Sequence, residues 1–411
     1  MMTEAQPSSA RAWVVTFAAL GINLMGGIIY AWSVLSKAMG SQWGWTKTQG
    51  ALPFAMATAS FAIMMIFAGR LQDRIGPRRV AMLGGVMLGL GYMLSSLVRT
   101  PGLMMLTMSV VGIGLGLAYS ATTPAAIKWF APGRKGLITG IVVSGVGLAA
   151  VYASPLAQFL LKQTSIENTF LILGIGCLVV VCLSSILVVN PPAGHVPAPA
   201  AARGSAGPVQ SIRFAGRNLD WHEMLKTAQF YFLWLMFVLS ASAGLMIISN
   251  ITQIADLQAQ WKNGFLAVML LAIFNTAGRF VSGFVSDRIG RTYTMILFFL
   301  LQAANMFAFV HYTSPALIMI GAAVTGLSYG TIYTLFPAAT ADFYGVRNLG
   351  VNYGFVFTAF GVAGVSGSLL GGRVADIFKN YQTAYTVSGI MLLVGVVLAL
   401  ATRAPKEARQ T

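Results

Sequence analysis

The chain has 411 residues, of which 57% are hydrophobic and only 9% are charged, and its mean hydropathy is +0.76. This composition excludes a soluble globular domain and predicts an all-helical integral membrane protein embedded in a lipid bilayer. The net charge of +16 does not indicate a nucleic-acid partner, because the basic residues lie in short loops between apolar runs, as membrane orientation requires.

Apolar runs long enough to cross a bilayer recur along the whole chain. They predict twelve transmembrane helices, at about 13–38, 50–69, 79–98, 102–127, 137–160, 168–190, 228–256, 262–286, 292–311, 314–341, 349–376 and 382–403. The first run is too long for the core of a cleavable signal peptide. Lys and Arg gather in alternate loops, so both termini are expected in the cytoplasm. The short loops favour a bacterial inner membrane.

One polar break separates the first six spans from the last six. It covers 191–227, begins with a stretch rich in Pro, Ala and Gly, and predicts a flexible cytoplasmic linker. Its end, NLDWHEMLKTAQF, offers Asn218 and Asp220 as helix caps and has apolar residues at helical spacing. A short interfacial helix is therefore predicted there. The expected organisation is a six-helix bundle over 1–190, this linker, and a second six-helix bundle over 228–411.

The two halves repeat each other at one constant offset. Residues of the first half recur in the second as Gly69 with Gly283, Asp73 with Asp287, Arg74 with Arg288, Gly76 with Gly290, Gly112 with Gly326 and Tyr119 with Tyr333. A fixed offset across separate spans indicates duplication. Two pseudo-symmetric bundles with a central linker are the arrangement of transporters that rock around a site at the membrane midplane.

Arg279 is the one charged residue inside the apolar run of the eighth span. A charge at membrane depth costs about 2.5–3.5 kcal/mol on insertion scales, so it is retained where it faces a cavity or a partner. Asn275, Ser282 and Ser286 share its helix face. The alternative is an arginine that snorkels to the nearer helix end. However, helical side chains lean toward their own N-terminus, which here is toward the membrane centre. We interpret Arg279 as a cation facing a water-accessible cavity.

Tyrosines and one amide are the further candidates for this cavity. Tyr119, Tyr329 and Tyr333 lie on glycine-rich helices, and Tyr329 and Tyr333 are four residues apart on one face. A buried tyrosine hydroxyl needs a hydrogen-bond partner, which is either a substrate oxygen or a neighbouring helix, and both interpretations stay open. Asn275 is expected to orient Arg279 or to contact substrate.

Metal, redox and nucleotide chemistry are not expected. Cys177 and Cys182 lie five residues apart in one apolar run, and the three His are scattered, so neither a disulfide nor a metal site is predicted. Nothing resembles a nucleotide-binding loop or a nucleophile–base pair. We therefore expect no cofactor, no enzymatic activity and no direct use of ATP.

The stretches GRLQDRIGPRR (69–79) and GFVSDRIGR (283–291) resemble the cytoplasmic signature of the major facilitator superfamily. The resemblance covers the whole chain and implies the major facilitator fold. Glycine in such a motif allows close helix contact, and the aspartate can meet a helix N-terminus or nearby arginines. Asp73, Arg74, Asp287 and Arg288 are accordingly expected to act in gating and not in substrate binding.

Four further stretches resemble the branch of oxalate/formate antiporters and monocarboxylate transporters. They are YAWSVLSKAMGSQWGWT, LDWHEMLKTAQFYFLW, FNTAGRFVSGFVSDRIGR and YGTIYTLFPAATADFYG. The resemblance places Arg279 where that branch keeps its carboxylate-binding arginine, whose planar fork meets a carboxylate bidentately. It also implies ligand-cavity roles for four more residues, Tyr30, Gln49, Phe357 and Phe360.

The chain departs from this branch at informative positions. Phe360 stands where the oxalate exchanger has a second cation, which favours a substrate with one carboxylate. Asn275 stands where animal monocarboxylate transporters carry an aspartate, and Val34 where they carry a lysine. No acidic residue lies deep in any span, so the residues do not reveal what would carry a coupled proton.

The sequence favours a secondary transporter of small monocarboxylates such as L-lactate or pyruvate. We expect a monomer that couples transport to protons by alternating access around Arg279. Two alternatives stay open. One is a carboxylate exchanger of the oxalate/formate type, and the other is a carboxylate sensor that binds on the same fold without transport.

Overall fold

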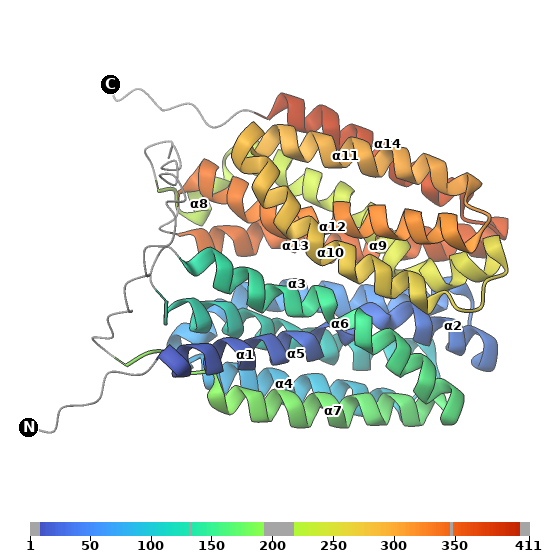
Figure 1. The fold of residues 1–411 in the computed structure, drawn as a ribbon, viewed down its shortest axis with the longest axis horizontal. Coiled ribbons are helices and arrows are strands. Elements are labelled where there is room, and N and C mark those ends of the chain that lie inside the picture. Colours follow the sequence, from blue (N-terminus) through green and yellow to red (C-terminus); the bar gives the residue numbers. More distant parts are fainter. Residues whose placement is uncertain (1–8, 131–133, 193–217, 346–347, 403–411) are drawn as a thin grey trace, which may run out of the picture.

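The computed structural model describes residues 9–130, 134–192, 218–345 and 348–402. Every regular element in these ranges is a helix, and eleven of the helices are long and apolar enough to cross a membrane. The helices up to α7 lie together on one side of the molecule, and those from α9 onward lie on the other (Figure 1). The prediction of an all-helical, multi-pass membrane protein is confirmed.

The helices follow the predicted spans closely. The first group comprises α1 (Ser9–Gly26), η1 (Gly27–Ala31), α2 (Trp32–Trp43), α3 (Lys47–Ile75), α4 (Pro77–Ser95), α5 (Pro101–Ile127), α6 (Lys135–Gln163) and α7 (Ile166–Leu187). The second comprises α9 (Ala228–Ala259), α10 (Phe265–Ile289), α11 (Arg291–Ala308), η3 (Phe309–His311), α12 (Pro315–Tyr344), α13 (Leu349–Phe378) and α14 (Gln382–Ala401). The short α8 (Trp221–Leu225) lies between the two groups.

The predicted span at about 79–98 is present as α4 but falls outside the eleven apolar helices. Because α4 has only 19 residues, its start at Pro77–Arg79 and its glycines lower its mean hydropathy. The same glycines allow close packing. A Cβ at Gly84 would lie 2.5 Å from the Ala118 nitrogen of α5, and one at Gly89 would lie 2.6 Å from the Leu178 Cβ of α7. Hydropathy alone therefore understates a helix whose glycines serve helix packing.

The first predicted span, about 13–38, is interrupted in its middle. The 3₁₀ helix η1 joins α1 to α2, and all five of its residues are buried. Its first residue, Gly27, approaches α6 so closely that a Cβ there would lie 2.5 Å from the Val146 carbonyl oxygen. A 3₁₀ stretch inside a helix often marks a functional hinge. Here it carries Tyr30, whose hydroxyl contacts α12.

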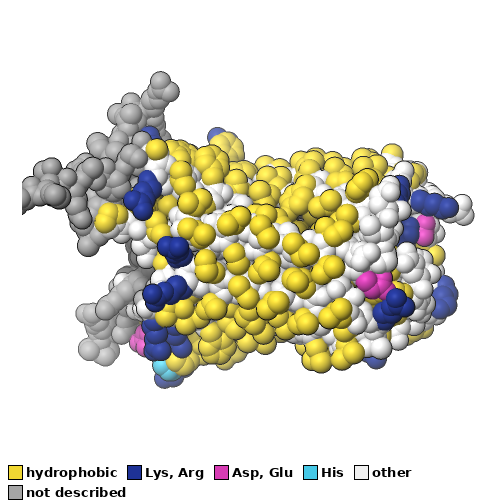
Figure 2. Space-filling model, turned by 90° about the horizontal axis from the view of Figure 1, so that it is seen from below, with side chains coloured by type: hydrophobic (Ala, Val, Ile, Leu, Met, Phe, Trp, Pro, Cys, Tyr) yellow, Lys and Arg dark blue, Asp and Glu magenta, His cyan; other side chains and the backbone are white. Residues whose placement is uncertain are grey.

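The two ends of the bundle differ. We call the end where α1 begins and α14 ends the terminal end, and the opposite one the far end (Figure 1). At the terminal end Gly76 and Gly290 each separate two helices with φ of 85° and 88°, a conformation that favours glycine. Apolar side chains cover the middle of the surface, and Lys and Arg gather toward both ends (Figure 2).

The far end is closed by contacts between the two groups of helices. The Asp376 carboxylate, near the end of α13, accepts hydrogen bonds from the backbone N–H groups of Lys47 (2.8 Å) and Thr48 (2.7 Å) at the start of α3. Lys37 of α2 pairs with Asp256 of α9 at 3.2 Å. Between these same two helices, Gln253 also donates to Ser36 at 3.1 Å, and Thr252 donates to the Ser33 carbonyl.

The short helix predicted at the end of the linker is present as α8. Asp220 caps it by accepting from the Glu223 N–H (2.8 Å), and the Glu223 carboxylate accepts from the Asp220 N–H (3.0 Å). This reciprocal pair is a capping box. Of the two predicted caps, Asp220 is the one that occupies the N-cap position of α8. Most of the linker, 193–217, lies outside the described residues.

Candidate functional site

A cavity of about 730 Å³ extends from the terminal end toward the middle of the molecule. Exposed Arg70 and Lys128 stand at its mouth, and Arg279 and Tyr333 stand at its inner end. Six helices contribute to its wall, namely α3, α5, α6, α10, α12 and α13. Its wall also includes Tyr119, Ser120, Thr123, Thr139 and Tyr353.

Arg279 is partly buried and is held by α6 and α12. Its Nη1 donates to the Val143 carbonyl of α6 at 2.8 Å, and its guanidinium carbon lies 4.5 Å from the centre of the Tyr333 ring. Its Nε is buried without a hydrogen-bond partner among the described residues. None of the ion pairs in the described part of the chain includes Arg279. Its charge is thus softened by a carbonyl and an aromatic face but is not neutralised.

The hydroxyl of Tyr333 joins the two groups of helices. It lies 3.0 Å from the Tyr30 hydroxyl of η1 and 2.9 Å from the Tyr329 hydroxyl one turn earlier on α12. Tyr333 therefore presents its ring to Arg279 while its hydroxyl is engaged. Tyr30 and Tyr329 lie behind it, outside the wall of the cavity, so of the predicted tyrosines Tyr119 and Tyr333 line it.

Asn275 lies one turn from Arg279 on α10, deeper in the molecule. Its side chain is only 2% exposed, and its Oδ1 has no hydrogen-bond partner among the described residues. It lines a separate void of about 10 Å³ together with Tyr30 and Gly147. The hydrogen bonds described for Arg279 do not include Asn275, so the expected orienting contact is not seen in this conformation.

The three other residues implied by the resemblance lie beyond the cavity. Phe357 and Phe360 stack on each other with ring centres 5.2 Å apart, and the Phe61 ring meets both edge to face at 5.5 and 5.7 Å. These buried rings form an aromatic plug behind the cavity. Gln49 lies at the far end, where it forms a capping box with Thr46 at the start of α3.

The residues predicted to act in gating lie at the terminal end. Asp287 pairs with Arg291 at 2.8 Å, and Arg291 also reaches Asp342 of α12 at 3.4 Å. Arg288 covers the Phe284 ring at 3.9 Å. Arg74 is exposed, and the side chain of Asp73 lies outside what the structure describes. In the second half, the charge cluster thus runs through Arg291, which the sequence reasoning left out.

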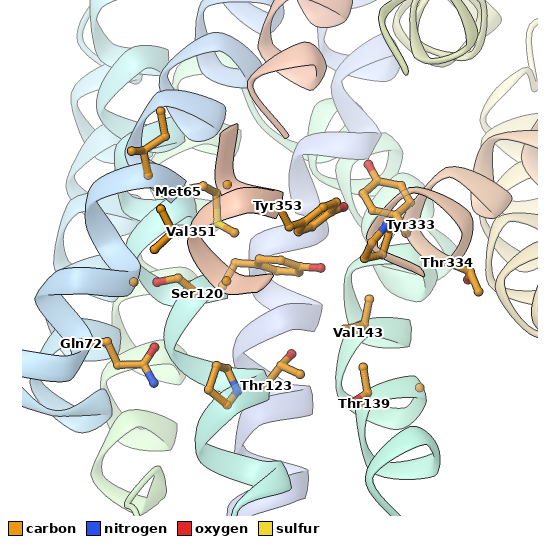
Figure 3. Close-up of a pocket in the computed structure, with 18 of the residues that line it drawn as sticks. Met65, Gln72, Ser120, Thr123, Thr139, Val143, Tyr333, Thr334, Val351 and Tyr353 are labelled. Carbon is orange, nitrogen blue, oxygen red and sulfur yellow. The ribbon is translucent and has the colours of Figure 1, made fainter. Parts of the chain in front are cut away.

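The structure adds cavity residues that sequence reasoning missed. Figure 3 shows the side chains of Tyr353, Ser120, Thr123, Thr139 and Tyr333 around one space. Tyr353 is four residues before Phe357 and lies on nearly the same helix face, so extending the Phe357 face by one turn would have found it. Ser120 and Thr123 follow Tyr119 directly. The Val143 carbonyl carries no signal in the sequence.

The charged residues on the described cavity wall are all cations. Arg70, Lys128 and Arg279 line it, and no Asp or Glu is among the described lining residues. A cleft lined by one sign of charge raises the local concentration of counter-ions. The wall is otherwise mostly apolar, with a few hydroxyls, so the site suits a small organic anion.

Comparison with known proteins finds membrane transporters of one superfamily. The sequence profile described as Major Facilitator Superfamily matches residues 14–310 and 245–411. A protein of Escherichia coli K12 named uncharacterized MFS-type transporter YhjX is 28% identical over 359 residues, 86% of each chain. The oxalate:formate antiporter of Oxalobacter formigenes is 25% identical over 397 residues, 95% of this chain and 90% of the relative.

A solved structure has a similar fold. It is the crystal structure of a bacterial homologue of the human lysosomal transporter Spinster, in an inward-facing and occupied conformation. It superposes with a TM-score of 0.71 over 96% of each chain, at 13% sequence identity.

Proposed function

Because this chain belongs to the Major Facilitator Superfamily, whose members are membrane transporters and not enzymes, we propose that it carries small monocarboxylates such as L-lactate or pyruvate. Transport is secondary and proton-coupled. It proceeds by alternating access, in which the cavity opens to one side of the membrane at a time. The terminal end faces the cytoplasm, as the distribution of Lys and Arg suggests.

The observation that carries this proposal is the state of Arg279. The guanidinium lies deep in the molecule, has no acidic partner among the described residues, and keeps an Nε without a hydrogen-bond partner. Binding an anion would neutralise its charge. A carboxylate that enters from the terminal end would pair with it through charge-assisted hydrogen bonds, which are stronger at a partly buried site than in bulk water. The neutral pair then costs less to occlude than the free cation does.

The surroundings of Arg279 support one carboxylate and a short apolar tail. Phe360 and Phe357 place aromatic surface behind the site, and the cations other than Arg279 on the described wall stand at the mouth. A second carboxylate held near Phe360 would meet no described counter-ion, which is costly inside a protein. Hydroxyls of Tyr119 and Tyr353 remain for an oxygen on the second carbon of the acid.

The test is uptake of labelled L-lactate into proteoliposomes, first with an inward proton gradient and then with the gradient collapsed by an ionophore. Gradient-dependent accumulation that disappears in Arg279→Gln is the expected result. Arg99→Gln is the matched control, because Arg99 is an exposed arginine paired with Glu167 outside the cavity. If Arg279→Gln accumulates lactate as the wild type does, the proposal is wrong.

Carboxylate exchange is the second candidate function. The similarity to an oxalate:formate antiporter favours it, and so does a described cavity wall without an acidic proton carrier. Uptake that ignores the proton gradient but needs carboxylate inside the vesicle would select exchange. Saturable binding without flux of any short acid would instead select the sensor hypothesis.

A further inference from the structure

The end of the linker is tied to the start of α13 by its backbone. We call residues 218–225 the strap. The N–H of Leu219 donates to the Tyr344 carbonyl at the end of α12 at 3.1 Å. The Leu219 carbonyl accepts from two side-chain amides, those of Asn348 (3.2 Å) and Asn352 (3.0 Å). One residue of the strap thus engages both the end of α12 and the start of α13.

Aromatic and apolar contacts strengthen this attachment. The Trp221 ring stacks on Phe355 of α13, with ring centres 5.1 Å apart and planes within 13°. Met224 of α8 is fully buried. Directly after α8, the Thr227 hydroxyl lies 3.0 Å from the Tyr344 hydroxyl. A connection that acts only as a tether between two bundles requires none of these contacts.

Two asparagine side chains at the start of α13 are bound to the strap. Asn348 occupies the N-cap position of this helix, where its side chain would ordinarily accept from the helix's own first N–H groups. No such cap is formed, and the amide donates to Leu219 instead. Asn352 is fully buried and is likewise committed to Leu219. The first turns of α13 are therefore joined to the strap by two side-chain hydrogen bonds.

The opposite face of the same turns lines the cavity. Asn348, Asn352 and Phe355 are spaced by four and three residues and share the face toward the strap. Gly350 and Tyr353, which lie on the other side of the helix, belong to the cavity wall. The start of α13 is thus held between the strap and the cavity.

We infer that the strap is a positioning element for transport, and that Trp221 and Asn352 set the place of Tyr353 and of the cavity wall beside it by fixing the start of α13. They act through α13 and do not touch the transported molecule. This role does not depend on which anion is carried. Of the two measurements that test it, only the KM for L-lactate rests on the proposed function.

The inference predicts a change in the position of α13 when the strap is loosened. Spin labels at Thr139→Cys on α6 and Val351→Cys on α13, in a Cys177→Ala, Cys182→Ala background, report the distance across the cavity wall. Trp221→Ala is expected to broaden or shift this distance distribution. Without labels, it is expected to raise the KM for L-lactate about fivefold, because a displaced wall binds less well. Trp221→Phe keeps a stacking ring and should restore both readouts.

Trp13→Ala is the matched control. Trp13 also lies at the terminal end, where it stacks on Phe17 and meets Phe130 edge to face, in the first group of helices and away from α13. This variant should leave the label distance unchanged. If Trp221→Ala does not fold, Asn348→Ala removes one of the two amide donors to Leu219 and is read in the same two ways.

An unchanged distance distribution and an unchanged KM in Trp221→Ala, with only a lower melting temperature, would overturn the inference and leave the strap a structural contact. Failure of the proposed function has a different signature. The wild type would then take up no short acid, while the label distance would still respond to Trp221→Ala.

Discussion

Arg279 shows how a membrane protein keeps a charge available at depth. One nitrogen is anchored to a backbone carbonyl and one face rests on an aromatic ring, so the side chain is fixed without being neutralised. Anchoring through Val143 and Tyr333 also fixes the direction of the guanidinium fork. A ligand therefore meets a preorganised cation and loses less entropy on binding.

The first prediction separates the charge of Arg279 from its shape. Arg279→Lys keeps the charge but loses the planar fork and the contact with the Tyr333 face. The kcat/KM for L-lactate should fall by about 10- to 100-fold, equivalent to about 1.4–2.7 kcal/mol. Arg279→Gln should lose saturable uptake altogether. Equal activity of the lysine variant and the wild type would show that bidentate geometry does not matter.

At the scale of elements, glycines determine how closely α10 and α12 approach. A Cβ at Gly330 would lie 2.0 Å from the Asn275 carbonyl oxygen, and one at Gly278 would lie 2.0 Å from the Leu327 carbonyl oxygen. The α10 backbone in the turn just before Arg279 is thus in direct contact with α12. Small residues at such crossings permit this approach.

The second prediction concerns this helix crossing. Gly330→Ala must push α12 away from α10, which should lower the free energy of unfolding by about 1–3 kcal/mol. It should also raise the KM, because Tyr333 moves relative to Arg279. Thermal unfolding in detergent and uptake kinetics measure the two effects. Gly102→Ala is the control, since a Cβ there meets nothing within 4 Å, and its melting temperature should not fall.

The third prediction concerns closure at the far end. Asp376 accepts two N–H groups at the start of α3, whereas the Lys37–Asp256 pair is partly exposed. Asp376→Ala should shift the free-energy difference between the closed and the open far end by about 1–2 kcal/mol toward the open form, because a charged helix cap is lost. Asp256→Asn should change it by less than about 1 kcal/mol, as exposed ion pairs do. Distances between spin labels placed across the far end give the populations of its closed and open forms. If the two variants shift these populations equally, the prediction that Asp376 contributes more than Asp256 is wrong.

At the scale of the whole molecule, the fourth prediction fixes the orientation in the membrane. Ser41 is exposed at the far end and Lys226 is exposed at the terminal end. In intact cells, Ser41→Cys should react with a membrane-impermeant maleimide, and Lys226→Cys should react only after permeabilisation. Cys177 is buried and Cys182 partly buried, and both are replaced by Ala to remove background. The reverse pattern would contradict the assignment from the charge distribution.

The sequence predicts the architecture well because the patterns that indicate it extend over many consecutive residues. Apolar length, alternating loop charge and the repeated glycine motifs locate the helices, and the caps of α8 locate even a five-residue element. Arg279 stands out because a single charge interrupts an apolar run. These features require no knowledge of which helices are neighbours.

The interior of the site is harder to predict because it depends on which helices meet. Tyr30, Phe357 and Phe360 are close to the site in space, yet they lie behind the cavity in this conformation. Gln49 lies at the far end as a helix cap. The anchor of Arg279 is a backbone carbonyl, which no residue type identifies. Whether these residues contact substrate stays a prediction.

The hydrogen bond between Tyr30 and Tyr333 marks where the open cavity ends and the closed part of the molecule begins, and this boundary affects how the membrane voltage acts on the protein. The cavity reaches Arg279 from the terminal end, and beyond the tyrosines the far end is closed. The membrane voltage therefore falls mainly across the short closed segment, and a unit charge that crosses it exchanges about 2.3 kcal/mol per 100 mV. An empty carrier moves the charge of Arg279 through this field when it reorients. A carrier that holds the anion alone moves almost none, and a proton bound with the anion restores one positive charge. The voltage of the cell would then act on the return of the empty carrier.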